Sequence, residues 1–218
     1  MLIKINGVEL FYKKSGSGPP LLLLHGNGED HTIFNKLGEK LGRHFTLYAI
    51  DSRGHGQSQR AEVFSYDLMA EDVYLFIQDL NLKKIHVIGF SDGAIISLLL
   101  SLKHPEVINK MALLGVNLKP ADFTDKSLGY INRVYWDTRD PLFKLMLDEP
   151  NIELSLLENI AAPTYVLAGE SDIIKREIFF KVAETIPNSK LKILKDHTHD
   201  SYIVNNDMLY EEFLDFFS

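Results

Sequence analysis

One stretch near the middle of the chain, residues 84–94, constrains the fold more than any other. Ile85, Val87 and Ile88 form a short β-branched run, which Gly89-Phe90-Ser91-Asp92-Gly93 and a second apolar run follow directly. A short β-branched run is typical of a strand that is buried on both faces of a parallel sheet. The Gly-x-Ser-x-Gly spacing favours a sharp strand-to-helix turn that presents the central side chain. These residues therefore predict a serine hydroxyl at the carboxyl end of a central strand.

The same five residues also fit an ordinary βα turn in which Ser91 caps the following helix. The remaining strands and helices decide between the two interpretations. Strands are predicted in a hairpin over 2–14 and at 21–24, 45–50, 85–88, 111–114, 164–168 and 191–194. Helices are predicted around 34–41, from Ser65 to about 80, and at 92–103, 174–186 and 209–216. This alternation predicts a single α/β domain over 1–218, a doubly wound, mostly parallel sheet with its site beyond the carboxyl ends of the strands.

Composition limits the classes of function. The chain has 218 residues, 45% hydrophobic and 24% charged, with a net charge of −7 and no cysteine. A negative chain without a clustered basic face is a poor partner for nucleic acid. The absence of cysteine excludes disulfides, a thiolate nucleophile and cysteine-ligated metal. The N-terminus has no signal region and no apolar run is long enough to span a bilayer, so we expect a cytoplasmic protein without membrane insertion.

Five motifs each follow a predicted strand: HGNG at 25–28, DSRGHGQS at 51–58, GFSDG at 89–93, GESD at 169–172 and HTHDSYI at 197–203. In this order, the five motifs resemble the α/β-hydrolase family over nearly the whole chain. The resemblance implies the α/β-hydrolase fold, with a small helical lid inserted at 117–161. It also implies a nucleophile, an acid and a base in the chain order Ser, Asp or Glu, then His.

A serine hydroxyl is a weak nucleophile near neutral pH, so it needs a base and an acid that orients that base. Ser91 is the expected nucleophile. The resemblance favours Asp172 as the acid, with Glu170 and then Asp122 as competitors.

Two histidines compete for the role of base. In similar proteins the catalytic histidine stands three residues before an aromatic residue, so Tyr202 selects His199 over His197. Thr198 departs from the pattern, since a glycine usually precedes this histidine.

The family's oxyanion hole is formed by two backbone N–H groups, which the resemblance assigns to Asn27 and Asp92. The side chain of Asp92 is expected to point away, toward solvent or a loop partner. The inserted segment is rich in aromatic residues, and Tyr130, Tyr135 and Trp136 are candidates for lining an acyl pocket.

These residues predict a serine hydrolase that cleaves a small or medium carboxylic ester through an acyl-enzyme. Thioester, lactone, amide and carbon–carbon bond hydrolysis remain open, because they use the same groups. A non-catalytic binding or scaffold protein on the same fold is the alternative. No H-E-x-x-H or similar spacing occurs, so neither a metal nor another cofactor is expected. The expected partner is a small acyl substrate, and no residue pattern indicates an oligomeric state.

Overall fold

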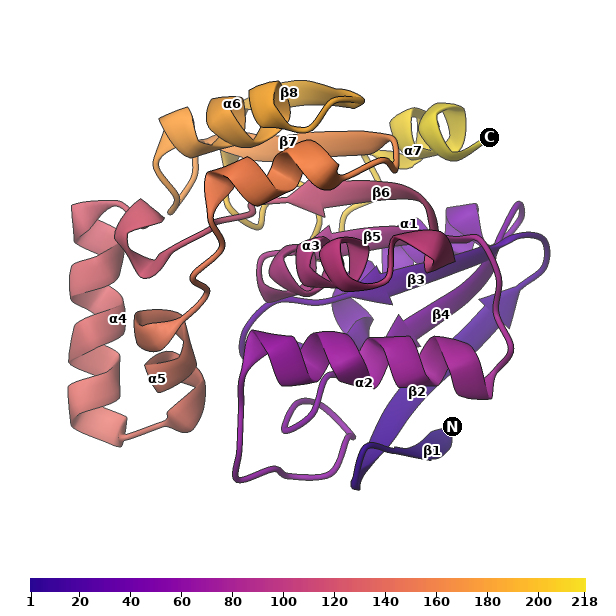
Figure 1. Ribbon diagram of the computed structural model, residues 1–218, viewed down its shortest axis with the longest axis horizontal. Helices are drawn as coiled ribbons and strands as arrows, with labels where there is room; N and C mark the ends of the chain where they lie inside the picture. The colour runs from indigo at the N-terminus through magenta and orange to yellow at the C-terminus, as the bar shows by residue number, and fades with distance from the viewer.

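The architecture is an eight-stranded sheet between two layers of helices. A computed structural model describes residues 1–218 and gives the strand order β1-β2-β4-β3-β5-β6-β7-β8. The first two strands pair antiparallel and the other six run parallel (Figure 1). The strands are β1 (Leu2–Ile5), β2 (Val8–Gly16), β3 (Pro20–Leu24), β4 (Thr46–Ile50), β5 (Ile85–Phe90), β6 (Ile108–Leu114), β7 (Thr164–Ser171) and β8 (Ser189–Thr198). The predicted doubly wound, mostly parallel sheet is confirmed.

The four leucines at the end of β3 explain how the sheet is buried on both faces. Successive side chains of a strand point to opposite faces. Leu22 and Leu24 accordingly belong to one hydrophobic cluster, and Leu21 and Leu23 belong to the other. All four are at most 1% exposed. A continuous apolar run is therefore the pattern that a central parallel strand requires.

Helices cover both faces of the sheet (Figure 1). The cluster on one face includes side chains of α1 and α7, and the cluster on the other includes side chains of α2, α3 and α6. The α-helices are α1 (Asn35–Leu41), α2 (Tyr66–Asp79), α3 (Asp92–Lys103), α4 (Asp125–Thr138), α5 (Pro141–Asp148), α6 (Arg176–Thr185) and α7 (Tyr210–Phe217). Four 3₁₀ turns complete the structure: His31–Phe34, Pro105–Val107, Pro120–Asp122 and Leu154–Asn159.

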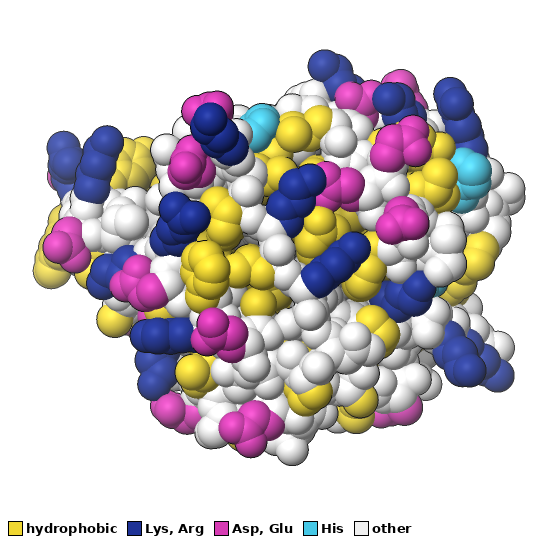
Figure 2. Space-filling model, turned by 90° about the horizontal axis from the view of Figure 1, so that it is seen from above, with side chains coloured by type: hydrophobic (Ala, Val, Ile, Leu, Met, Phe, Trp, Pro, Cys, Tyr) yellow, Lys and Arg dark blue, Asp and Glu magenta, His cyan; other side chains and the backbone are white.

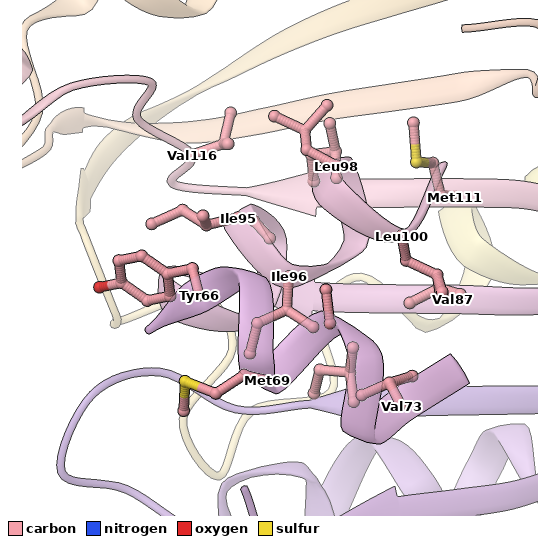
Figure 3. Close-up of a cluster of buried hydrophobic side chains, with 14 of the residues drawn as sticks. Tyr66, Met69, Val73, Val87, Ile95, Ile96, Leu98, Leu100, Met111 and Val116 are labelled. Atoms are coloured by element: carbon pink, nitrogen blue, oxygen red, sulfur yellow. The ribbon is translucent and has the colours of Figure 1, made fainter. Parts of the chain in front are cut away.

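Helix α3 starts at the Ser91 turn and lies between the sheet and α2. Figure 3 shows Ile95 and Ile96 of α3 near Tyr66 and Met69 of α2, and Leu100 of α3 near Val87 of β5. The first residue before α2, Ser65, accepts a hydrogen bond from the N–H of Leu68, as its predicted capping role requires. The helix that follows the nucleophile turn is thus held on two sides by apolar packing.

The inserted segment 117–161 contains two helices, α4 and α5, that lie side by side at one end of the molecule (Figure 1). We call residues 125–148, which comprise α4 and α5, the helical hairpin. Thr124 caps α4, and Asp140 caps α5 by accepting from the N–H of Leu142. Only Ile131, Leu145 and Met146 of the hairpin are buried. The hairpin is therefore attached to the sheet by a small apolar contact.

Two details at the C-terminal end differ from the sequence expectation. Strand β8 runs on to Thr198, which pairs with Ser171 of β7, so the chain segment with His199 starts at the end of the sheet. The last helix, predicted at 209–216, is α7 and runs to Phe217; its buried side chains are Phe213 and Phe217, whereas Phe216 is only partly buried. Phe217, four residues after Phe213, lies closer to the helix face of Phe213 than Phe216, which is three residues after it.

The surface carries charges of both signs. On the face seen from above, Lys and Arg side chains are interspersed with Asp, Glu and hydrophobic side chains (Figure 2). The edge strand β8 contributes Lys190, Lys192 and Lys195, and charged side chains on an edge strand discourage pairing with another chain. None of the helices combines the length and the apolar character needed to cross a membrane.

Candidate active site

Ser91 occupies a strained turn between β5 and α3. Its φ of 51° lies in the left-handed region, which non-glycine residues rarely adopt. The flanking glycines permit the turn: a Cβ on Gly89 would collide with the Gly93 carbonyl, and a Cβ on Gly93 would collide with the Leu24 carbonyl. The Ser91 side chain makes no capping hydrogen bond. The ordinary N-cap interpretation of this serine is therefore wrong.

The structure brings His199 and Asp172 into direct contact. His199 follows β8, Asp172 follows β7, and the imidazole Nδ1 lies 2.7 Å from Asp172 Oδ1. The carboxylate also accepts the N–H groups of Ile174 at 3.1 Å and Gly169 at 3.4 Å. Because an acceptor faces Nδ1, that nitrogen carries the proton in the neutral ring and Nε2 has a free lone pair. Nε2 is buried and has no hydrogen-bond partner in the protein.

The competing residues lie elsewhere. His197 faces Ser201, whose Oγ is 2.9 Å from its Nδ1, and it does not contact Asp172. Glu170 is exposed and accepts the N–H of Asp196. Asp122 accepts two backbone N–H groups at the start of the inserted segment, from Leu118 and Lys119. Of the alternatives that the sequence left open, only Asp172 with His199 forms a carboxylate–imidazole pair.

A glycine on the neighbouring strand makes room for the imidazole. Gly115, directly after β6, has a φ of +62°, and a Cβ there would lie 2.5 Å from Cε1 and 2.8 Å from Nδ1 of His199. The ring of Phe90 also packs against the imidazole, with ring centroids 4.9 Å apart. Two positions that come from the sheet thus contact the His199 ring.

Two backbone segments meet beside Ser91. Asp92 begins α3, and the first N–H groups of a helix have no intrahelical acceptor. Gly26 lies against the nucleophile, since a Cβ on Gly26 would be 3.0 Å from Ser91 Cβ. Asn27 follows directly in this loop. The segment expected to supply the second oxyanion donor therefore passes next to the serine.

The Asp92 side chain is not directed to solvent. It is 3% exposed and accepts hydrogen bonds from the Tyr66 hydroxyl at 2.8 Å and the Asn27 Nδ2 amide at 3.2 Å. Burial raises the pKa of this carboxyl. The solvent half of the sequence expectation is wrong and the loop-partner half is confirmed, because two donors offset the cost of burying the group. Asn27 also donates to the Leu142 carbonyl at 3.2 Å, which connects the nucleophile turn to α5.

The remaining polar residues of the motifs join the loops around the site. His25 Nε2 accepts the N–H of Ser52, and burial lowers the pKa of His25 to about 4. Arg53 forms a buried, two-contact ion pair with Asp72 of α2, both contacts at 2.6 Å. His55 Nδ1 lies 3.0 Å from the Arg53 carbonyl. These contacts give the three residues a structural role in holding the loops together.

One grouping of acids and histidine is close enough to share a metal ion: Asp30, His31 and Asp51. The carboxylate of Asp51 already makes hydrogen bonds within the protein. Asp51 Oδ1 faces both the N–H and Nδ1 of His31, and Oδ2 accepts the N–H of Gln57. The donor set therefore fits an internal hydrogen-bond cluster better than a metal site.

A cavity of about 640 Å³ opens over Ser91, Asp172 and His199. It lies between the strand ends and the helical hairpin. Its other lining residues are Gly26, Asn27, Glu29, Phe90, Thr124, Lys126, Ser127, Tyr130, Ile131, Arg133, Phe143, Met146, Ser171, Ile173, Thr198 and Asp200. This volume suits a small or medium ligand.

The cavity corrects the expected set of aromatic residues. Tyr130 lines it, but Tyr135 and Trp136 do not. Residues five and six positions along an α-helix lie on other faces than the first residue. Tyr135 and Trp136 contact each other, and Arg139 lies 4.0 Å from the Trp136 ring centroid. The sequence analysis missed Phe143 and Met146 of α5 as lining residues, although their spacing of three positions was available as a signal.

Glu29 is an ionisable group of the cavity that no sequence motif indicated. Its Oε2 accepts the N–H of Gly26 at 2.9 Å, and it lines the same cavity as Ser91. Burial raises the pKa of Glu29 to about 7, despite the opposing hydrogen bond from Gly26. A single acid directly after the HGNG motif carries no sequence signal for such a position.

The chain is similar to several known hydrolases. The chain is 28% identical to the serine hydrolase BPHL of Homo sapiens over 97% of this chain and 85% of that protein. It is 32% identical to the uncharacterized hydrolase YraK of Bacillus subtilis, over 50% of this chain and 41% of that protein, so this match spans less than half of the relative.

A solved structure of a thermophilic esterase from Thermogutta terrifontis superposes with a TM-score of 0.85 at 22% identity. The match covers 100% of this chain and 98% of the esterase, and it shows a shared fold. The sequence model of the family described as alpha/beta hydrolase fold matches residues 19–145, more than half of the chain. The protein therefore belongs to the α/β-hydrolase family.

Proposed function

We propose that this protein is a serine hydrolase that cleaves carboxylic esters through an acyl-enzyme. The observation that carries the proposal is the state of His199. Its Nδ1 is held by Asp172 at 2.7 Å, while its buried Nε2 has no partner and lines the same cavity as Ser91. A free lone pair on an oriented imidazole is what a general base for a serine nucleophile requires.

The proposed reaction uses five groups of the chain. His199 Nε2 takes the proton of Ser91 Oγ as the oxygen attacks the ester carbonyl. The backbone N–H groups of Asn27 and Asp92 stabilise the oxyanion of the tetrahedral intermediate. His199 then protonates the leaving alcohol. Water attacks the acyl-enzyme by the same route and regenerates Ser91, and Asp172 stabilises the imidazolium in both steps.

The helical hairpin acts in this proposal as a short lid over a small or medium acyl substrate. Tyr130, Phe143 and Met146 supply its inner surface. The contact of Asn27 with the Leu142 carbonyl holds the lid to the nucleophile loop. Thioester, lactone and amide substrates use the same groups, so the chain-length and leaving-group preferences distinguish among them.

A panel of 4-nitrophenyl esters of increasing acyl length tests the proposal. The wild-type protein is expected to hydrolyse the short members, and a fluorophosphonate probe is expected to label Ser91 and to abolish that hydrolysis. Ser91→Ala is the matched control for labelling. A folded wild-type protein with neither activity nor label at Ser91 would instead support a non-catalytic binding protein on this fold.

A further inference from the structure

The cations of the inserted segment fall into two groups. Segment 117–161 contains five Lys and Arg residues. Three have partners: Lys119 is 2.7 Å from Glu153, Lys144 is 2.5 Å from Asp148, and Arg139 lies over Trp136. The other two, Lys126 and Arg133, make no ion pair, hydrogen bond or cation–π contact within the protein. Both of them line the cavity over Ser91.

Their positions on α4 place them on one side of the helix. Lys126, Tyr130 and Arg133 are spaced four and three residues apart, which aligns them on a single face. All three are exposed, so they form the solvent side of the cavity mouth. On the face of α4 at the cavity mouth, the aromatic ring of Tyr130 therefore lies between two cations.

The acidic groups of the cavity are already engaged. Asp172 holds His199, Asp200 accepts the Thr198 hydroxyl at 2.9 Å, and Glu29 accepts the Gly26 N–H. Lys126 and Arg133 are thus the charged side chains of the cavity lining that have neither a hydrogen-bond partner nor an ion-pair partner. An anionic group on a ligand would supply the missing partner.

We propose that Lys126 and Arg133 select ester substrates that carry an anionic group, such as a carboxylate, on the part that lies against α4. The inference rests on the proposed ester hydrolysis and adds the substrate class. The pair acts on binding and not on bond cleavage, so its effect falls on KM more than on kcat. The charges are exposed, and their attraction to the substrate therefore weakens as salt rises.

Two matched pairs of esters test the inference. The first compares 4-nitrophenyl hydrogen glutarate, with a carboxylate on the acyl part, with its neutral methyl ester. The second compares 4-acetoxybenzoate, with a carboxylate on the leaving group, with its neutral methyl ester. The readout is the ratio of kcat/KM for the anionic member to that for the neutral member, because intrinsic reactivity then cancels between protein variants.

Lys126→Gln with Arg133→Gln is expected to lower this ratio about tenfold for at least one pair, mainly through KM, the size expected for two exposed charge pairs. The control is Lys4→Gln with Arg60→Gln, which removes two exposed charges that do not line the cavity and is expected to leave the ratio unchanged. The difference between the two variants should shrink as the salt concentration rises from about 0.01 M to about 1 M.

Charge reversal tests for a gain of activity toward a cationic ester, which a misfolded variant would not show. Lys126→Glu with Arg133→Glu is expected to raise kcat/KM for an ester with a trimethylammonium group relative to the anionic esters. If the wild type hydrolyses the neutral esters but neither double variant changes the ratio beyond the control, the inference is overturned and ester hydrolysis stands. If the wild type hydrolyses none of the esters, the proposed function fails and the inference fails with it.

Discussion

The strand ends and the helical hairpin face each other across one cavity, but the chain holds them in different ways. Ser91 and His199 are fixed by buried strands and by close contacts at Gly93 and Gly115. The hairpin has three buried side chains, and its residue Trp136 is 62% exposed. In the proposed reaction, the chemistry that tolerates little displacement is placed on the buried strand ends, and contacts with the rest of the substrate are placed on the more exposed helical hairpin.

The largest effect is expected for the base. His199→Ala should lower kcat/KM by at least about 10³-fold, because it removes the only imidazole bound to Asp172. His197→Ala is the matched control and should change the rate less than about threefold, because His197 contacts Ser201 instead. Ester hydrolysis by both variants measures this, and the reverse result would reassign the base to His197.

One glycine-to-alanine substitution in each region compares the two regions directly. Gly115→Ala places a methyl group 2.5 Å from His199 Cε1 at a φ of +62°, so kcat/KM should fall about 10²-fold. Gly129→Ala on α4 meets no atom within 4 Å. It should raise the free energy of unfolding by about 0.5–1 kcal/mol, since alanine favours a helix over glycine.

Kinetics and urea unfolding of both glycine variants provide the measurement. Equal loss of activity in the two variants would remove the distinction between the rigid strand ends and the tolerant hairpin.

A smaller, pH-dependent effect is expected at Glu29. Burial raises its pKa from 4.5 to about 7, so the folded protein keeps a proton that the unfolded chain releases at lower pH. The stability that this group contributes is complete below about pH 4.5 and is lost as the pH rises through about 7. Glu29→Gln removes the dependence, and the variant should exceed the wild type by about 1–3 kcal/mol at pH 8, with no gain at pH 4.

Urea unfolding between pH 4 and pH 8 checks the Glu29 prediction. The exposed Glu184→Gln serves as the control, and it should show no such trend. A constant difference between Glu29→Gln and wild type at every pH would contradict the assignment of the titration to Glu29. The pH profile of kcat/KM should also lose a component near pH 7 in Glu29→Gln, because the carboxyl lines the cavity beside Ser91.

The smallest effects should separate two aromatic residues of α4. Tyr130 lines the cavity and Trp136 does not. Tyr130→Ala should lower kcat/KM several-fold, about 2- to 10-fold, through lost contact with substrate. Trp136→Ala should stay within about twofold in rate and about 1 kcal/mol in stability, since it loses an exposed contact with Arg139. A larger effect at Trp136 would extend the substrate site along α4.

Most of the fold followed from local patterns. The strand at 21–24, the hairpin over 2–14 and the helix that starts at Ser65 each depend on neighbours in sequence, and the structure confirms all three. Side-chain contacts across long separations were harder. The position of the Asp92 carboxylate was predicted only in part, because its donors, Tyr66 and Asn27, are 26 and 65 residues away. Nothing in the Asp92 segment itself signals these partners.

By itself the sequence determined the order of the candidate site residues along the chain: a serine on a tight turn, then an acid and two candidate histidines after later strands. These depend on backbone geometry and on motif order, which are local. The tertiary structure decided which histidine meets Asp172, that Glu29 enters the cavity, and that Lys126 and Arg133 line it while other cations of the hairpin pair off. Such outcomes depend on burial and on packing between distant segments, and no local pattern encodes either.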